Sequence, residues 1–157
     1  MSKLSDLLHR AEARVGAALD PGIMFVSWRD LLFISWPVPV SAIRPLVPAE
    51  LEIDTFDGNA WISIVPFNNA EAHFRDLPSL PGQANFAELN LRTYVKLASG
   101  PSVYFLSLDC TSTVADLIGR MFHLPFYRAD MNVAFDGTTA TYSSTRTEPN
   151  VAPAQLE

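Results

Sequence analysis

Apolar residues near the start of the chain recur every three or four positions, between charged residues. Positions three and four apart fall on one face of a helix, so this spacing predicts one amphipathic helix over residues 3–19, before Pro21 and Gly22. The apolar positions are Leu4, Leu7, Leu8, Ala11, Val15, Ala18 and Leu19.

After this helix the pattern changes to that of β-strands, with β-branched and aromatic residues over residues 23–36. This run predicts one long or bent strand, and Pro37 and Pro39 end it because proline removes a backbone donor from a sheet. Ser41 is a favourable cap for a short helix that stops before Pro48.

Two Asp-Gly pairs are the strongest turn signals in the sequence. Each pair lies between two strand-like runs, and Asp-Gly readily adopts the positive φ angles of a two-residue hairpin turn. The pairs predict two β-hairpins, residues 51–56 with 59–67 and residues 128–135 with 138–145.

The middle of the chain predicts a long loop, two strands and a second helix. Residues 68–87 are polar and contain proline and glycine, a composition that predicts a loop. Strands at 88–97 and 102–110 follow. A helix at 113–122 comes next, with Ser112 as its cap.

Together these elements predict a single domain over residues 1–157, with a β-rich core at 23–146 and a tail at 147–157. Strands joined mainly by hairpins, with two or three helices, are typical of the α+β class with mainly antiparallel strands. A barrel is one form that such a sheet takes. No internal repeat or low-complexity tract divides the chain.

The composition argues against several classes of function. The formal net charge is −6 and no basic run is present, so binding to nucleic acid or to an anionic membrane is not expected. The longest uncharged apolar stretch, Leu31–Ile43, is too short to span a bilayer, and the charged N-terminal segment is not a signal peptide. The cytoplasm is therefore the expected location. With Cys110 as the single cysteine, neither an internal disulfide nor a cysteine-rich zinc site can form.

The strand at residues 88–97 carries the most informative pattern, because successive side chains point to opposite faces of a strand. One face is apolar and must meet a core; it consists of Leu89, Leu91, Val95 and Leu97. The other face consists of Glu88, Asn90, Arg92, Tyr94 and Lys96. A polar face of this kind has two interpretations: a solvated outer surface, or the lining of a pocket inside a barrel.

The other polar residues give weaker signals. Asp109 ends the next strand, on the same predicted side as Phe105, and is either a turn or cap acceptor or a catalytic group. The histidines His9, His73 and His123 have no metal-ligand spacing. The sequence also has no nucleophile elbow, phosphate loop or dinucleotide-binding fingerprint. Neither a metal nor a cofactor is expected.

Five longer runs occur in a fixed order: WRDLLFISWPVP from residue 28, FDGNAWISIVPF from 56, FAELNLRTYV from 86, VYFLSLD from 103 and LPFYRA from 124. In this order they resemble the YqjF-like family of unknown function, within the acetoacetate decarboxylase superfamily. The resemblance covers residues 23–146 and implies an acetoacetate-decarboxylase-like barrel. It says little about activity, because one fold hosts many functions.

The resemblance also implies that this barrel is incomplete. The C-terminal third of the family has no counterpart in this chain. Open strand edges must be covered, so either a partner protomer covers them or the chain is a short form of the family. We expect a homo-oligomer, most simply a two-fold dimer.

The family's site residues carry over only in part. An arginine near the start of the first strand binds the substrate carboxylate in the decarboxylases, and Arg29 stands at the matching place; its other interpretation is a salt bridge to a neighbouring acid. A family glutamate corresponds to Glu88, whereas Trp61 replaces a second one. Phe126 and Tyr127 replace two lysines, of which the first forms a Schiff base with the ketone. Decarboxylation through a Schiff base is therefore not expected.

Two functions follow from the resemblance. The first is a pocket for a small molecule with a carboxylate or carbonyl group, in which Glu88 acts as a base and Tyr127 as a proton donor in enolisation or dehydration. The side chains expected to hold the ligand are Arg29, Arg92, Tyr94, Trp61 and Phe126. The second is a non-catalytic oligomeric domain with a structural or interaction role, which kept the fold and lost the site.

Overall fold

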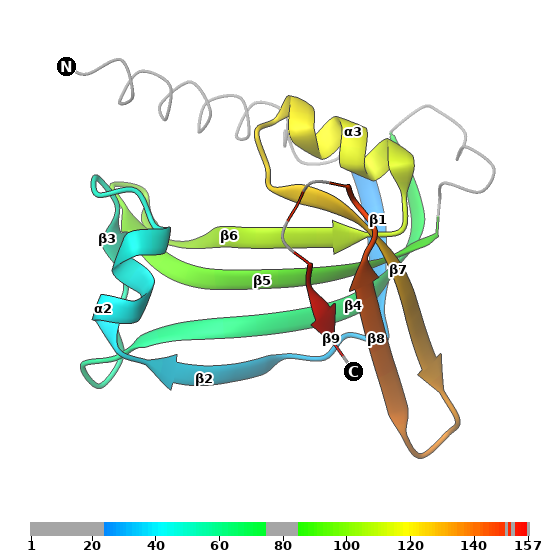
Figure 1. Cartoon of the computed structure of the whole chain (residues 1–157), viewed down its shortest axis with the longest axis horizontal. Coiled ribbons are helices and arrows are strands. Elements are labelled where there is room, and N and C mark those ends of the chain that lie inside the picture. Colours follow the sequence, from blue (N-terminus) through cyan, green and yellow to red (C-terminus); the bar gives the residue numbers. More distant parts are fainter. Residues whose placement is uncertain (1–23, 75–84, 150, 152, 157) are drawn as a thin grey trace.

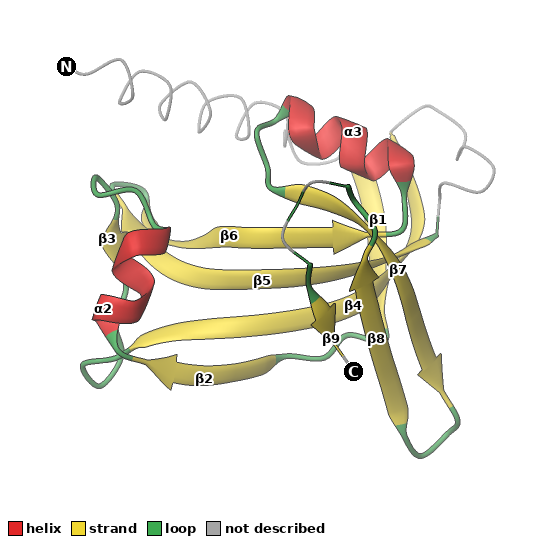
Figure 2. Cartoon of the chain, in the orientation of Figure 1, coloured by secondary structure: helices red, strands yellow, loops and turns green. Residues whose placement is uncertain are grey.

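The computed structural model of the protein describes residues 24–74, 85–149, 151 and 153–156 (Figure 1 and Figure 2). The helix predicted at residues 3–19 lies outside these residues. The described part is a mainly antiparallel β-sheet with short helices, so the predicted α+β class is confirmed.

Five strands form the body of the sheet: β1 (Met24–Arg29), β2 (Ile34–Val38), β4 (Ala60–Phe74), β5 (Phe86–Leu97) and β6 (Gly100–Cys110). Neighbouring strands are antiparallel, with β4 beside β5 and β5 beside β6. β1 lies along the second half of β4 and β2 along its first half, so these two short strands form one edge of the sheet. The two-residue strand β3 (Glu52–Ile53) pairs with the end of β5.

The remaining strands continue the sheet from the end of β6. The helix α3 (Thr113–Met121) connects β6 to β7 (Phe126–Phe135), which pairs in parallel with the last residues of β6. β7 and β8 (Ala140–Arg146) form a hairpin, and β9 (Gln155–Leu156) pairs with β8. Figure 1 shows this hairpin running steeply across the direction of β4, β5 and β6. In the described part of the chain the sheet is open, with β1 at one end of the strand order and β9 at the other.

The prediction of a single strand over residues 23–36 is wrong, because β1 and β2 are separate. Asp30 adopts a φ of 52°, in the left-handed region, and turns the chain between them. The Tyr142 hydroxyl on β8 donates a hydrogen bond of 2.9 Å to the Asp30 carbonyl. Pro37 lies inside β2 and does not end it, which an edge strand tolerates because one side of its backbone has no sheet partner to lose.

The first Asp-Gly turn forms, but the chain segments on its two sides do not pair along their length. Asp57 and Gly58 have φ angles of 51° and 76°, and the backbone groups of Phe56 and Asn59 exchange hydrogen bonds of 3.0 and 3.1 Å across the turn. Before the turn, β3 diverges from β4 and pairs with β5. The predicted hairpin of residues 51–56 with 59–67 is therefore reduced to one bridge.

The prediction of a loop over residues 68–87 is wrong at 68–74 and 86–87, which are strand, and its middle part, 75–84, lies outside the described residues. β4 continues to Phe74 and β5 begins at Phe86. The polar composition was misleading because Asn69 is buried inside β4, where its side-chain amide donates a 3.0 Å hydrogen bond to Glu88. A buried amide that is hydrogen-bonded costs little, so a polar residue of this kind does not break a strand.

The two strands after this segment, the second helix and the second hairpin are confirmed. The Ser112 hydroxyl accepts a 3.1 Å hydrogen bond from the Ala115 amide and so caps α3, as predicted. In the turn between β7 and β8, the Asp136 carboxylate accepts hydrogen bonds of 2.9 and 2.7 Å from the amides of Thr138 and Thr139. The predicted tail is partly structured, because β9 pairs with β8.

The short helix predicted after Ser41 is present in two parts, α2 (Val40–Ile43) and the single 3-10 turn η1 (Arg44–Leu46). Pro39 precedes α2 and no side chain caps it, so Ser41 is not the cap. Arg44 is the first residue of η1. Its guanidinium group donates hydrogen bonds to three backbone carbonyls within residues 47–51. These bonds fix the chain that leads from the helix into β3.

A hydrophobic core lies where α2 meets the β3 end of the sheet, on the left of Figure 1. Its buried residues are Ile43, Val47, Ile53, Ala60 and Val95. Val95 belongs to the predicted apolar face of β5, so this face meets a core as expected. Burying a side chain of this size is worth about 1.5–3 kcal/mol.

A bulge in β6 changes which residues share a face. Leu91 pairs with Ser107 but Arg92 pairs with Phe105, so Leu106 is an extra residue between them. Phe105 therefore lies on the same face as Arg92. Simple alternation had placed it on the side of Ser107 and of the aspartate that ends the strand, and that prediction is wrong.

Candidate functional site

Polar side chains gather on one face of β5, which we call the Glu88 face. Strand pairing places on this face Glu88, Asn90, Arg92 and Tyr94 from β5, Trp61, Ser63 and Asn69 from β4, and Ser35 from β2. The four side chains from β5 are all at least partly buried. The Glu88 face is therefore not a solvated outer surface over this stretch, which favours the interpretation as a pocket lining.

Glu88 is a carboxyl held by amides. Its Oε2 accepts a 3.0 Å hydrogen bond from Asn69 Nδ2, and the side chain of Asn90 forms a second one. Burial raises the pKa of Glu88 from its ordinary 4.5 to about 7, and the two amide hydrogen bonds only partly oppose this rise. Within the described residues no cation pairs with it. At neutral pH such a carboxyl exists in both protonation states, as a general acid or base must.

Arg92 is a partly buried cation that stacks on rings. Its guanidinium carbon lies 4.9 Å from the centroid of the Phe33 ring and 5.9 Å from that of Tyr94. No acidic group among residues 24–74 and 85–149 forms an ion pair with it, and its buried Nε has no hydrogen-bond partner there. Stacking leaves the edge of a guanidinium available to bind an anion.

The Glu88 face holds several polar atoms that are buried and lack a partner. They are Oδ1 of Asn90, Nε of Arg92, Nε1 of Trp61 and, by its pairing with Cys110, Nε of Arg128. Asn90 is only 7% exposed. A buried polar atom without a partner costs about 1–3 kcal/mol, so groups of this kind normally bond to water or to a ligand.

The end of the Glu88 face at Tyr94 is built differently. The Tyr94 hydroxyl shares a 2.8 Å hydrogen bond with Ser63 Oγ, which shares another of 2.6 Å with Ser35 Oγ. Next to them an open hollow of about 460 Å³ is lined in part by Trp61 and Asp54.

The structure does not place Arg29 on the Glu88 face. Arg29 pairs with Asn68, whose side chain points to the other side of the sheet from Glu88. Its Nη2 lies 3.1 Å from Oε1 of Glu71, and both side chains are mostly exposed. Arg29 lines a separate open hollow of about 430 Å³ together with Asn69, and Glu88 does not line that hollow. The geometry agrees with the second interpretation of Arg29, a salt bridge to a neighbouring acid.

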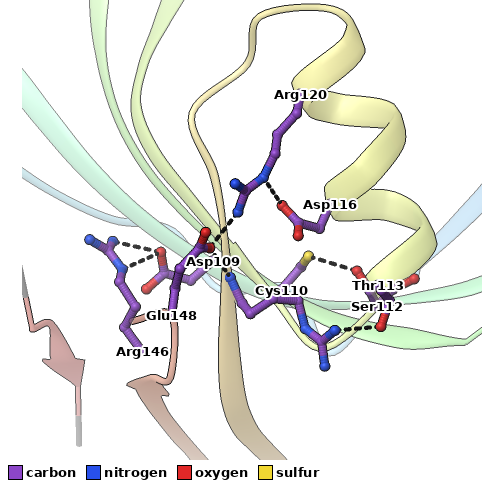
Figure 3. A network of polar contacts seen from close by, with 9 residues as sticks. Asp109, Cys110, Ser112, Thr113, Asp116, Arg120, Arg146 and Glu148 are labelled. Carbon is purple, nitrogen blue, oxygen red and sulfur yellow. Dashed lines mark hydrogen bonds and ion pairs between the residues drawn. The ribbon is translucent and has the colours of Figure 1, made fainter. Parts of the chain in front are cut away.

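Tyr127 also lies on the opposite face from Glu88, because it pairs with Asp109 across β6 and β7. The Arg146 guanidinium lies 4.0 Å above its ring and donates hydrogen bonds of 2.6 and 3.2 Å to Asp109 Oδ1. Figure 3 shows the Arg146–Asp109 pair at the end of β6. Asp109 is 3% exposed, so it is half of a buried ion pair and is not a turn acceptor. Burial raises the pKa of Asp109, and Arg146 limits the rise.

Phe126 lies on the Glu88 face by register but is covered by α3. Its ring packs so closely on Gly119 that a Cβ added there would lie 2.1 Å from a ring carbon. On the same helix Arg120 pairs with Asp116 one turn earlier and with Glu148 (Figure 3). The contact with Arg120 lowers the pKa of Glu148 and fastens α3 to the chain after β8.

Cys110, the last residue of β6, is not a reactive thiol. Its Sγ donates a 3.3 Å hydrogen bond to the Ser112 carbonyl (Figure 3). Burial raises the pKa of Cys110 to about 12, so the nucleophilic thiolate is scarce at neutral pH.

Three members of the Glu88 face were not predicted from the sequence: Ser35, Ser63 and Asn69. Ser63 had a usable signal, since it stands two residues after Trp61 in a run of strand pattern and so shares its face. Asn69 was missed because the segment around it was predicted to be a loop. Ser35 was missed because β1 and β2 were treated as one strand.

The described residues contain neither a candidate metal-ligand cluster nor a candidate membrane span. No group of three or more histidine, cysteine, aspartate or glutamate side chains is arranged to hold a metal ion there. No helix in the described part is both long enough and apolar enough to cross a membrane.

Comparison with protein families identifies relatives. The DUF2071 family, described as an uncharacterized conserved protein, matches residues 26–157. The chain belongs to this family. YqjF from Bacillus subtilis strain 168, an uncharacterized protein, is 48% identical over 125 residues, which cover 79% of this chain and 52% of YqjF. The resemblance derived from the sequence is therefore confirmed.

Solved structures with a similar fold include an acetoacetate decarboxylase (TM-score 0.61, 16% identity, 82% of this chain and 47% of that one). An acetoacetate decarboxylase-like enzyme from Sphingomonas wittichii RW1 gives a TM-score of 0.61 at 14% identity, over 84% of this chain and 55% of that one. The enduracididine biosynthesis enzyme MppR, complexed with the condensation product of pyruvate and imidazole 4-carboxaldehyde, gives 0.61 at 14% identity, over 83% and 53%.

At these identities the likeness shows the fold alone. This DUF2071 chain thus has an acetoacetate-decarboxylase-like fold. It spans about half the length of YqjF and of the solved structures that it matches.

Proposed function

We propose that the Glu88 face binds a small organic molecule with a carboxylate or carbonyl group, with Arg92 contacting its anionic end and Glu88 exchanging a proton with it. The observation that carries this proposal is a pair of opposite charges, both partly buried on one face of one strand, neither in an ion pair with a described residue. Charged side chains that leave water are normally paired, so both retain a capacity to bond to a ligand.

The spacing of the two charges suits a small ligand. Glu88 and Arg92 are four residues apart on β5, which puts their Cα atoms about 13 Å apart. Asn90 lies between them on the same face, and its buried Oδ1 has no hydrogen-bond partner among the described residues. A guanidinium presents two parallel donors to a carboxylate, and stacking on two rings restricts how Arg92 can turn.

Acid–base chemistry is the reaction type that this arrangement supports. A carboxyl with a pKa of about 7 can take a proton from the carbon next to a carbonyl and return it to another atom of the ligand. Enolisation and dehydration need no more than this. Tyr127, predicted as the proton donor, lies on the other face, so in our proposal Glu88 itself returns the proton.

Amine chemistry is not part of the proposal. Phe126 and Tyr127, at the positions that match the family's lysines, carry no amine. Lys96 lies at the exposed end of the Glu88 face, 3.2 Å from Glu52 and 3.6 Å from Asp54. These carboxylates raise the pKa of Lys96, the reverse of what a Schiff-base nucleophile needs.

The solved structures suggest the first probe. MppR, whose fold resembles this one at 13% identity, has been solved in complex with pyruvate. Pyruvate bears both a carboxylate and a ketone, the two groups that our proposal requires. We therefore choose pyruvate and its longer 2-oxo homologues as test ligands.

Binding is measured by isothermal titration calorimetry on the wild type and on Arg92→Met, Glu88→Gln and Arg29→Ala. We expect Arg92→Met to weaken binding by at least about tenfold, the loss of one charge-assisted contact. Arg29→Ala should bind like the wild type, because Arg29 lies on the other face. Loss of binding in Arg29→Ala with Arg92→Met unaffected would refute the assignment of Arg92, and no binding of any 2-oxo acid would refute the pocket.

Proton exchange tests the chemistry separately. If Glu88 enolises the ligand, the methyl protons of pyruvate exchange with deuterium in D₂O faster in the presence of the wild type than of Glu88→Gln, as followed by proton NMR. Binding without such exchange would leave a binding pocket and refute the catalytic role of Glu88.

A second candidate function, an oligomeric structural or interaction domain, is favoured by one observation. The edge formed by β1, β2 and the turn between them exposes large apolar side chains: Val26, Trp28, Leu31, Leu32, Phe33, Ile34 and Trp36. An exposed apolar edge invites pairing with another chain, most simply a two-fold copy. Size-exclusion chromatography with light scattering tests it, and a monomer at all concentrations would exclude the dimer.

A further inference from the structure

An open hollow lies at the end of the Glu88 face farthest from Glu88. It has a volume of about 460 Å³ and is lined by Ser35, Asp54, Thr55, Phe56, Trp61 and Tyr94. Tyr94 is six positions after Glu88 along β5, so their Cα atoms are about 20 Å apart. The hollow is therefore distant from Glu88, although it shares Tyr94 with the function proposed above, in which Arg92 stacks on that ring.

Three of the six lining side chains are aromatic rings. The rings of Phe56 and Trp61 have centroids 6.4 Å apart and meet edge to face at 62°. Phe56 is 66% exposed, yet its backbone is fixed by the hydrogen bonds that it exchanges with Asn59 across the turn. Tyr94 is held from the other side through its hydroxyl group, which bonds to Ser63. The rings thus surround the hollow on ordered backbone.

The hollow also presents a carboxylate. Asp54 is the one charged side chain among its six lining residues, and its backbone amide donates a 3.0 Å hydrogen bond to the Tyr94 carbonyl, which fixes it beside that ring. Lys96 lies 3.6 Å from Asp54 but closer to Glu52, at 3.2 Å. Two carboxylates therefore share one ammonium group, while the guanidinium carbon of Arg92 lies 5.9 Å from the centroid of the Tyr94 ring.

Aromatic faces and a carboxylate together recognise one chemical class. The face of an aromatic ring is electron-rich and attracts cations, most strongly those that shed water easily. An alkylated ammonium group has few or no N–H donors to satisfy, so it needs rings and a nearby negative charge more than it needs hydrogen-bond acceptors. We propose that the hollow lined by Asp54, Phe56, Trp61 and Tyr94 binds a small alkylated ammonium cation, such as the trimethylammonium group of choline.

The test compares choline with its uncharged carbon analogue, 3,3-dimethyl-1-butanol, at constant ionic strength on the whole chain. Binding is followed by the indole N–H signal of Trp61 in ¹H–¹⁵N NMR, assigned through Trp61→Phe. We expect a saturable shift with choline and at least about tenfold weaker binding in Phe56→Leu and in Asp54→Asn, the loss of one ring or one charge from such a site. Phe135→Leu is the matched control, since this ring is also exposed, at 63%, but lies on the β7–β8 hairpin.

Three results would overturn the proposal: equal binding of the uncharged analogue, a Trp61 signal that does not respond to choline, or unchanged affinity in both Phe56→Leu and Asp54→Asn. Circular dichroism establishes that each variant is folded. Phe56 is an exposed side chain and Asn is isosteric with Asp, so both substitutions are expected to leave the fold intact.

Discussion

Replacing Glu88 with glutamine tests whether a buried carboxyl is kept in this sheet at a cost to stability. Below about pH 4.5 the carboxyl is protonated in the folded and unfolded chain alike, so it contributes no pH dependence. Between pH 4.5 and about 7 the unfolded chain releases the proton while the folded protein retains it. Stability therefore falls as pH rises through this range and is constant above it.

The size of this loss follows from the two pKa values. Each pH unit is worth about 1.4 kcal/mol, so the rise from 4.5 to about 7 corresponds to at most about 3 kcal/mol. Glutamine keeps the shape and can still accept the hydrogen bond from Asn69, but it never ionises. Glu88→Gln should therefore match the wild type near pH 4 and be more stable by up to about 3 kcal/mol near pH 8.

Urea unfolding at these two pH values measures the difference. Glu50→Gln, at an exposed glutamate outside the site, is the control and should leave the pH dependence unchanged. A stability difference between wild type and Glu88→Gln that is the same at both pH values would refute the raised pKa. If Glu88→Gln is more stable than the wild type but no longer accelerates proton exchange of pyruvate, Glu88 is retained for function at a cost to stability.

Three further substitutions test the packing around the site by urea or thermal unfolding. Arg146→Met leaves the buried Asp109 without its partner and should cost about 3–5 kcal/mol, part of which Asp109→Asn in the same chain restores; an effect below about 1 kcal/mol would contradict a buried pair. Gly119→Ala places a Cβ against the Phe126 ring and should destabilise by about 1–3 kcal/mol, with partial rescue by Phe126→Leu, whereas stabilisation would show that the ring moves aside. Ser112→Ala removes the cap of α3 and should cost about 1 kcal/mol, and no change would mean that the cap bond is absent.

The alternation along β5 was the most reliable signal in the sequence. It placed Glu88, Asn90, Arg92 and Tyr94 on one face, and the structure confirms this because β5 has strands on both sides that keep it regular. The same rule failed in β6, where one bulged residue shifts the alternation by one position. The bulge leaves no mark in the pattern of apolar residues, because Leu106 follows the equally apolar Phe105.

Composition misled at residues 68–74 for a different reason. Polar residues predict a loop only if their side chains stay in water, and Asn69 instead finds a buried carboxyl partner. That partner, Glu88, is nineteen residues away along the chain. Local sequence cannot reveal a pairing over this distance, although it is what makes a polar strand stable.

The assignment of Arg29 from the family pattern failed for another reason: whether a residue is at an odd or an even position of a strand decides the face to which its side chain points. Trp28 lies on the Glu88 face, with its ring centroid 5.6 Å from that of Phe67, so its neighbour Arg29 must point to the other side of the sheet. A cation for an anionic ligand on the Glu88 face has to come from a different strand position, and Arg92 is one that forms no ion pair with a described residue.

Placing the ligand-binding cation at Arg92 instead of Arg29 has a physical consequence for the ligand. When the cation and the proton-exchanging carboxyl lie on one strand, the strand rise sets their separation, and a shift between neighbouring strands cannot alter it. Arg92 and Glu88 are four residues apart on β5 with no bulge in β5 itself, so their separation is as rigid as the strand. A ligand of fixed length between its anionic end and its reacting carbon would then be preferred. We therefore expect affinity across the 2-oxo acid series to pass through a maximum at one chain length, and a series that binds with equal strength at every length would argue that Arg92 and Glu88 do not act on the same molecule.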